Sequence, residues 1–315
     1  MPRLLPESSD TVATALRSGF RKTRAVFPVV AALYGVSLLV AGIVVIPFFL
    51  TLSEAFGSST AAQGLSEGFD FTIVHDLLRF QGDGVVRFLG RLFWLCPFVF
   101  VLNTILSGGI LEVAAPGFQL PAIVGFLQGC GRHAGRFLAL LGVVILLCAP
   151  VPLLLCTGLI AIAPDVIRNS ASENVIPILA ASAVICGVLS AGFASLLMDY
   201  ARVILVLDLK QGVTGSVFRA LRFLSHNVSR VTGLQAILVL AWAATLSLPL
   251  MLALVRPQGT ALLLVAAFLL HQLFVAVRQA VRVLSASAQL SLYHCVTMCA
   301  GTGLDARLPC PGSGL

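Results

Sequence analysis

The stretch VVAALYGVSLLVAGIVVIPFFL, residues 29–50, contains no charged side chain. A helix rises about 1.5 Å per residue, so roughly 20 apolar residues cross a hydrocarbon layer about 30 Å thick. In lipid, backbone N–H and C=O groups must be paired within the segment, and a helix pairs them. The stretch therefore predicts a transmembrane helix. It is expected to remain as an anchor, because it is too long for the apolar part of a cleavable signal peptide.

Similar apolar stretches recur along the whole chain. The six predicted spans are residues 25–52, 92–111, 137–163, 176–198, 231–255 and 260–277. The composition agrees, since 58% of the 315 residues are hydrophobic and 10% are charged, whereas a soluble domain has about 25% charged residues. The sequence therefore predicts an all-α, polytopic membrane protein with six transmembrane helices.

The distribution of basic residues predicts the orientation of these spans. Six spans place both termini on one side of the membrane. That side receives all but five of the 20 Lys and Arg residues, the exceptions being Arg79, Arg87, Arg91, Arg168 and Arg256. Because an excess of Lys and Arg marks cytoplasmic segments, we expect both termini in the cytoplasm. The net charge of +7 follows from this bias and requires no nucleic-acid partner.

Three segments of related pattern precede the odd-numbered spans. They are TVATALRSGFRKTRAVF (11–27), PAIVGFLQGCGRHAGRF (121–137) and GSVFRALRFLSHNVSRV (215–231). Each combines apolar residues at helical spacing with a basic end, a pattern that lets a helix lie in the membrane interface. We therefore expect three repeats, about 10–112, 120–210 and 215–300, each an interfacial amphipathic helix followed by a transmembrane hairpin. Alternatively, the shared pattern reflects no repeat, because any membrane protein with a cytoplasmic N-terminus carries basic residues before its outward spans.

This organisation divides the chain into three parts. We expect a cytoplasmic amphipathic helix over residues 1–24, one six-helix transmembrane domain over 25–300, and a disordered cytoplasmic tail over 301–315. Anionic headgroups at the inner face of the membrane are the expected lipid partners of nearby basic side chains. The candidate headgroup contacts are Arg17, Arg21, Lys22, Arg24, Arg136, Arg219, Arg222 and Arg230.

Charged side chains recur at similar depth near the predicted ends of the even-numbered spans. Either they mark the cytoplasmic interface, or they pair between helices and join the repeats. For the second interpretation, the candidate network comprises Glu112, Asp199, Arg202, His271, Arg278 and Arg282. Asp199 and Arg202 are also close enough in sequence to pair within one helix. A proton or ion pathway is less favoured, because it would place ionisable groups near the midplane, where His271 is essentially the only candidate.

No motif predicts catalysis or a bound cofactor. Ser190 and His271 fall in the fourth and sixth spans, as in intramembrane serine proteases of the rhomboid type, but Val188 and Ala191 replace the glycines of that signature. His294, Cys295 and Cys299 lack the further ligands of a metal site. The eight cysteines show no disulfide spacing and are expected to be reduced. We therefore predict no enzyme, no catalytic residues, no cofactor and no metal.

The stretch MDYARVILVLDLKQGVTGSVFRALRFL, residues 198–224, closes the fourth span, turns, and begins an Ala-Leu-Arg helix. In this it resembles a group of poorly characterised bacterial six-helix membrane proteins, which is similar to the membrane domain found fused to glycerophosphodiester phosphodiesterases. The resemblance implies a location in the bacterial inner membrane and an unassigned role. It carries over no catalytic residue, because the phosphodiesterase domain is absent from this sequence.

Two classes of function fit these patterns. The first is a non-enzymatic scaffold or accessory subunit whose interfacial helices bind anionic lipid or a membrane protein partner. The second is a permease or lipid-handling transporter with a passage lined by the odd-numbered spans, which carry Pro47, Pro150, Pro152 and Pro249. Proline removes a backbone donor and kinks a helix, so we expect kinks at these positions.

Overall fold

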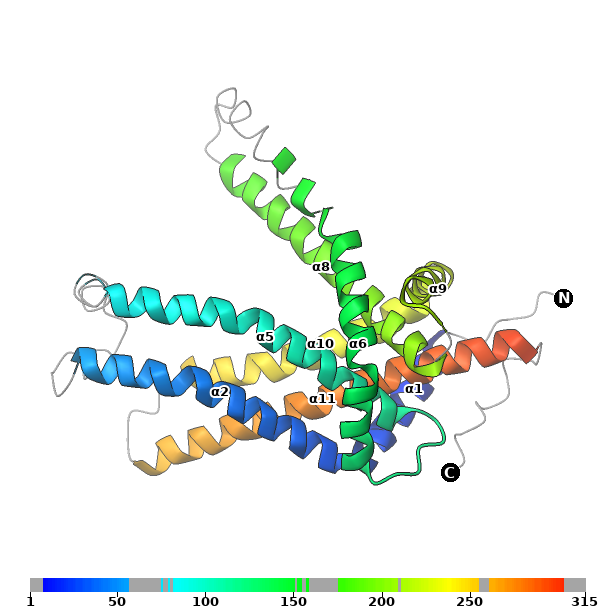
Figure 1. Cartoon of the computed structure of the whole chain (residues 1–315), viewed down its shortest axis with the longest axis horizontal. Helices are drawn as coiled ribbons and strands as arrows, with labels where there is room; N and C mark the ends of the chain where they lie inside the picture. The colour runs from blue at the N-terminus through cyan, green and yellow to red at the C-terminus, as the bar shows by residue number, and fades with distance from the viewer. Residues whose placement is uncertain are drawn as a thin grey trace. The chain divides into compact units, whose positions relative to one another are not determined.

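The computed structural model of the chain is all-α (Figure 1). It describes residues 8–56, 75, 79, 82–150, 152–154, 157–158, 175–208, 211–254 and 261–302, and this part of the chain holds no strand. The helices are α1 (Ser8–Ala25), α2 (Phe27–Phe56), α5 (Gly82–Ala114), α6 (Ala122–Cys148), α8 (Val175–Leu207), α9 (Val213–His226), α10 (Val228–Leu254) and α11 (Ala261–Thr302).

Six of these helical segments are long and apolar enough to cross a membrane, which confirms the predicted fold class. They are Phe27–Leu50, Phe88–Ala114, Ala122–Leu154, Ala180–Leu207, Val228–Ser247 and Val265–Thr297. Three helices run past the predicted ends of their spans at 111, 198 and 277. Helix α5 reaches Ala114, α8 reaches Leu207 and α11 reaches Thr302. The predicted tail lies outside the described residues from 303 onward.

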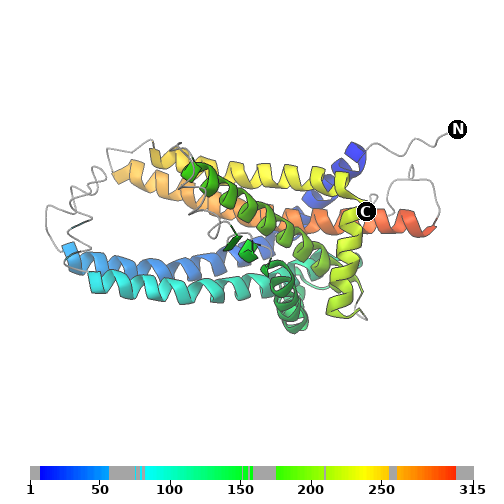
Figure 2. The same cartoon turned by 90° about the horizontal axis from the view of Figure 1, so that it is seen from above.

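The chain divides into two compact units, residues 31–103 and residues 1–30 with 104–315. In the first unit, α2 and α5 run side by side (Figures 1 and 2), and the rings of Phe48 and Phe88 lie 4.8 Å apart. Large apolar side chains on both helices are exposed, including Leu39, Phe49 and Trp94. Such exposure suits hydrocarbon as the surrounding solvent.

The second unit contains a contiguous cluster of buried apolar side chains, called the packed core below. It is built by α1, the last turns of α5, α6, the end of α8, α9, the start of α10 and the end of α11. Its centre is the last part of α8, where Leu197, Tyr200 and Leu205 are almost fully buried. Around it, α1 packs on α11 and α10, and α9 packs on α8 and α6.

The three repeated segments do not all form separate helices. Segment 11–27 forms α1 and ends near Pro28, which lacks the backbone donor that would continue the helix into α2. Segment 215–231 gives α9, which ends before Asn227, and α10 follows. Segment 121–137 is different, since it is the first part of the continuous helix α6. The prediction of a separate interfacial helix is wrong there, because α6 contains no proline to interrupt its hydrogen bonds.

The prolines occupy different places in the helices. Pro47 lies inside α2 as predicted, and Pro97 also lies inside a helix, α5, where no kink was expected. Helix α6 ends at Cys148, just before Pro150.

Candidate functional site

A polar cluster lies where α5, α8 and α11 meet in the packed core. Arg202 Nη2 donates a hydrogen bond to Thr104 Oγ1 of α5 at 3.2 Å. Arg202 Nη1 lies 3.7 Å from Asp199 Oδ1, one turn earlier on α8. Gln289 Nε2 of α11 donates to Asp199 Oδ2 at 3.1 Å. The Asp199 carboxylate is therefore held from its own helix and from α11, although 35% of its side chain stays exposed.

Two further residues belong to this cluster, called the Arg202 cluster below. The Arg202 guanidinium carbon lies 5.8 Å from the centre of the Phe137 ring of α6, a cation–π arrangement. Arg282 of α11 lies within electrostatic reach of both Asp199 and Arg202. Three of the predicted network residues, Asp199, Arg202 and Arg282, are thus brought together, and Gln289 joins them.

Glu112 lies elsewhere, against α6. Its Oε2 is 2.9 Å from His133 Nε2, and its Oε1 accepts a hydrogen bond from Arg132 Nη1 at 3.4 Å. His133 is almost completely buried, and within the described part of the chain its Nδ1 has no hydrogen-bond partner. Sequence reasoning missed His133, because only the contact between α5 and α6 gives it a role.

Glycines bring these two helices together. A Cβ on Gly109 would clash with the Phe126 carbonyl oxygen and lie 2.6 Å from Cys130 Sγ. A Cβ on Gly129 would lie 2.6 Å from Glu112 Cβ. Any larger side chain at either glycine would therefore force α5 and α6 apart, and Glu112 reaches His133 because neither carries one.

The remaining two residues of the predicted network lie outside both groups. Arg278 has its guanidinium carbon 5.0 Å from the centre of the Trp242 ring, so it joins α11 to α10. His271 is exposed on α11, and no hydrogen bond or ion pair to the other five residues is seen within the described residues.

The candidate headgroup contacts differ in their surroundings. At least three of them bond to the protein itself. Lys22 Nζ donates to Ala114 O at 2.8 Å, Arg136 Nη2 donates to Gln211 O at 2.6 Å, and Arg219 pairs with Asp208 at 3.2 Å. Lys22 and Arg136 thereby satisfy carbonyls at or just beyond the ends of α5 and α8, where a positive charge also suits the helix dipole.

The remaining candidates lie mostly at the surface. Arg17, Arg21, Arg24 and Arg222 are exposed and Arg230 is half-buried. Burial, and then the neighbouring Arg21, lowers the pKa of Lys22.

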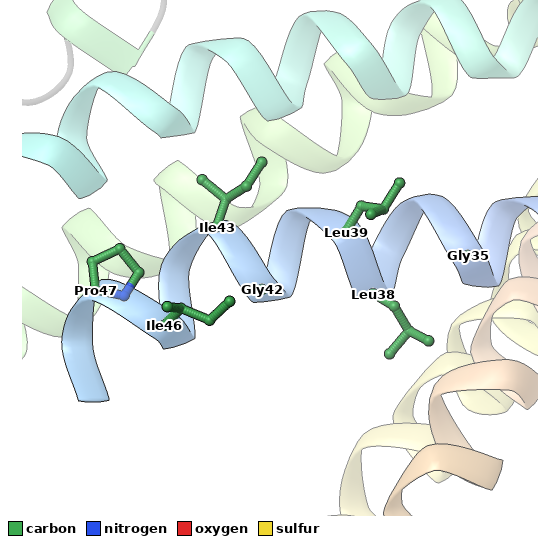
Figure 3. Close-up of a pocket in the computed structure, with 7 residues that line it drawn as sticks. All are labelled: Gly35, Leu38, Leu39, Gly42, Ile43, Ile46 and Pro47. Atoms are coloured by element: carbon green, nitrogen blue, oxygen red, sulfur yellow. The ribbon is translucent and has the colours of Figure 1, made fainter. Parts of the chain in front are cut away.

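An apolar pocket lies along α2 (Figure 3). The residues that line it are Gly35, Leu38, Leu39, Gly42, Ile43, Ile46 and Pro47. None of these side chains carries a polar group, so the pocket suits hydrocarbon and cannot orient a polar ligand.

Candidate metal ligands are not gathered together among the described residues. No three His, Cys, Asp or Glu side chains there could hold a metal ion. Ser190 Oγ donates to Gly187 O of its own helix at 2.9 Å. Cys96, Cys130, Cys148 and Cys186 are free, but Cys295 is in a disulfide, so the expectation of reduced cysteines is wrong at that position.

Comparison with known proteins adds no assignment. No protein-family model, no curated protein and no solved structure matches the chain. The resemblance carried by residues 198–224 therefore stays a prediction, and function is inferred from the geometry of the described residues.

Proposed function

We propose that this protein is a non-enzymatic scaffold or accessory subunit of the bacterial inner membrane. Both termini lie in the cytoplasm, and α1, α9 and the first turns of α6 contact anionic lipid or a membrane protein partner at the inner face. The observation that carries this proposal is the pairing of large exposed apolar side chains with arginines on the outward surfaces of these segments.

The outward surface of α1 combines an aromatic ring with positive charge. Phe20 is 66% exposed, and Arg17, Arg21 and Arg24 are exposed beside it at helical spacing. An aromatic ring that enters the interface with guanidiniums at headgroup level is typical of a helix lying on an anionic membrane.

Helix α9 and the start of α6 offer similar surfaces. Phe218 is 72% exposed on α9, one turn from the exposed Arg222. On α6, Leu127 is 63% exposed, and Arg132 is exposed little more than one turn later. The opposite faces of α1 and α9 are buried in the packed core, and the start of α6 is buried at Phe126 and His133, so the exposed apolar side chains are available to lipid or to a partner.

The contacts of these segments also support the proposed three-repeat organisation. Helix α1 packs on α11, α9 packs on α8, and the glycine contacts place the start of α6 on the end of α5. Each segment thus packs on the helix that would end another repeat. The start of α6 packs on the end of the first repeat, α9 on the end of the second, and α1 on the end of the third. Each pair of proposed repeats therefore has one such contact.

The lipid contacts can be tested with charge-matched variants of the full chain. Arg17, Arg21 and Arg24 are changed together to Gln, and the control changes Arg79, Arg87 and Arg91, predicted on the opposite side, to Gln. In nanodiscs of phosphatidylcholine, addition of phosphatidylglycerol is expected to raise the Tm of the wild type and of the control, and to raise that of the α1 variant less, because α9 and the start of α6 keep their arginines. An equal increase in all three proteins would contradict the proposal.

A second experiment separates a scaffold from a transporter. The tagged chain is cross-linked in native membranes and purified, and a partner at constant stoichiometry that is lost with Phe20→Ser or Phe218→Ser supports the scaffold. Substrate-dependent flux in proteoliposomes, with no such partner, would favour a transporter in which the proline-containing helices line a passage.

A further inference from the structure

We propose that the first turns of α6 form a docking site for an acidic amphipathic helix of a partner protein at the inner face of the membrane. The site is a set of aliphatic side chains, called the α6 stripe below, which are Leu120, Ile123, Val124 and Leu127. The orientation of the chain is taken from the proposed function, on which this docking site therefore rests. The docking site goes further, because it gives this surface to protein rather than to lipid.

The α6 stripe lies on one exposed side of a rigidly held helix. Its four side chains are between 47% and 63% exposed, and residues at positions i, i+3, i+4 and i+7 share one face of a helix. The opposite face is buried at Phe126 and Gly129, where α6 packs closely on the end of α5. The end of α5 therefore fixes these turns, and the stripe faces outward.

Helix α6 carries the stripe away from the hydrocarbon. Residues 137–154 contain no charged side chain and rise about 27 Å as a helix, so they match a hydrocarbon core roughly 30 Å thick. Arg132 and Arg136 come directly before this segment. Leu127 precedes Phe137 on the same continuous helix, and the interval corresponds to about 15 Å. The stripe therefore begins about 15 Å beyond the hydrocarbon.

Lipid cannot cover a surface at that distance. The headgroup layer on each side of a bilayer is about 5–8 Å thick. A helix tilted by about 40°, the upper end of the usual range, would still place Leu127 about 11 Å from the hydrocarbon. Helix α6 is continuous through these turns, so they do not fold down onto the bilayer. The stripe therefore projects into water, where a contiguous exposed apolar surface is typical of a protein interface.

The charge around the stripe selects the kind of partner. Arg132 keeps 56% of its side chain exposed beside the stripe, although it contacts Glu112. The inner side is also predicted to hold all but five of the 20 Lys and Arg residues. An acidic partner is attracted to such a surface, whereas a second copy of the chain would bring the same positive charge. An amphipathic helix fits the stripe, because its own apolar face has the same helical spacing.

The depth of the stripe can be measured first, with the full chain. In a variant whose native cysteines are replaced, Leu127→Cys and Leu146→Cys each receive a fluorophore in bilayers whose acyl chains carry a quencher. Leu146 is 78% exposed and lies within 137–154, so its label should be quenched, whereas the label at position 127 should not. Quenching at both positions would place the stripe in lipid and overturn the docking site, without affecting the lipid contacts proposed for α1 and α9.

The same cysteine at position 127 also checks the orientation. An impermeant maleimide should label Leu127→Cys in spheroplasts only after permeabilisation. Labelling in intact spheroplasts would contradict the orientation in the proposed function, and the docking site with it.

Cross-linking in native membranes identifies the occupant. The photoreactive residue p-benzoylphenylalanine replaces Leu127 or, as a control, Leu146, and the cross-linked peptides are sequenced by mass spectrometry. Position 127 is expected to join a segment of another protein that combines acidic residues with aliphatic residues at helical spacing, and position 146 should not join it. Four outcomes would contradict the proposal: a lipid adduct, an adduct with a second copy of the chain, a segment without acidic residues, or no adduct.

A synthetic peptide of the cross-linked segment then gives an affinity for the chain in phosphatidylcholine nanodiscs. Leu127→Ala is expected to weaken binding about tenfold, because it removes a buried aliphatic contact. Arg132→Gln should also weaken binding and reduce its dependence on salt. Leu146→Ala makes the matched change in the lipid-facing part of α6 and should bind like the wild type. Equal affinities of Leu127→Ala and Leu146→Ala would overturn the docking site.

Discussion

The amine of Lys22 is partly buried at the end of a helix, and burial disfavours its charge. It donates to Ala114 O, one of the carbonyls that the end of α5 leaves without a helical partner. Burial lowers the pKa of this amine, and Arg21 lowers it further. Between the lowered pKa and the ordinary lysine pKa, the unfolded chain binds more protons than the folded chain. Stability should therefore rise as pH increases through that window.

Replacement of Lys22 by Gln tests this linkage, because the amide can still donate to Ala114 O but does not titrate. The wild type should gain stability relative to Lys22→Gln as pH rises from neutral toward the ordinary lysine pKa of about 10.4. The measurement is the Tm of both proteins in the same detergent across that range. Parallel curves would show that Lys22 titrates alike in the folded and unfolded chains.

His133 gives a second prediction at this scale. Its ring fills a buried position between α5 and α6, and its Nε2 meets Glu112 Oε2 at 2.9 Å. His133→Leu keeps much of the volume but leaves the carboxylate without this partner, so it should cost about 1–2 kcal/mol of unfolding free energy. His133→Gln, which can still donate to Glu112, should lose less. Equal losses in unfolding titrations would indicate that only the shape of His133 matters.

The sequence predicts some of these residue contacts and not others. Asp199 and Arg202 are three positions apart, so the spacing alone brings them together on one helix. The network interpretation allowed Glu112 to pair with Arg202, Arg278 or Arg282, yet it contacts Arg132 and His133. That choice depends on how closely two helices approach, which hydropathy and charge do not reveal.

At the scale of helices, the approach of α5 and α6 depends on Gly129. An alanine there would place Cβ 2.6 Å from Glu112 Cβ and 3.0 Å from Gly109 Cα. These atoms belong to rigid parts of α5, so the helices must separate. Gly129→Ala should therefore destabilise the protein by about 1–3 kcal/mol, as overpacking does. The measurement is reversible unfolding in mixed micelles.

Gly131→Ala is the matched control, because no atom lies within 4 Å of the Cβ that it adds. It lies on the same helix, where Ala is favoured over Gly by up to about 1 kcal/mol. It should be neutral or stabilising. If both alanines have the same effect, the close approach of α5 and α6 does not limit stability.

A helix boundary could be predicted from the sequence where a single residue interrupts the helix. Pro28 explains why α1 and α2 are separate, and its effect is readable from the sequence. The continuity of α6 through residues 121–137 was not expected, because resemblance to 11–27 suggested a break. No residue in that part of α6 imposes one.

At the scale of the molecule, the six spans were predictable and the packed core was not. A run of about 20 apolar residues identifies a span whatever surrounds it. A leucine that faces lipid and a leucine that faces another helix look alike in sequence, since lipid is as apolar as the protein interior. The burial of Tyr200 and Leu205, beyond the predicted end of the fourth span, follows from packing by α6 and α9.

The orientation gives the last prediction, which concerns the whole chain. Single cysteines are introduced as Thr60→Cys, Ser170→Cys and Ser225→Cys in a variant whose native cysteines are replaced. Residues 60 and 170 fall in the predicted outer connections, whereas Ser225 is exposed on α9, beside the basic residues that predict the cytoplasmic side. A membrane-impermeant maleimide should label the first two in intact spheroplasts, and Ser225→Cys only after permeabilisation. Because six spans place the two outer connections on one side and α9 on the other, labelling of all three in intact spheroplasts would require a different number of crossings.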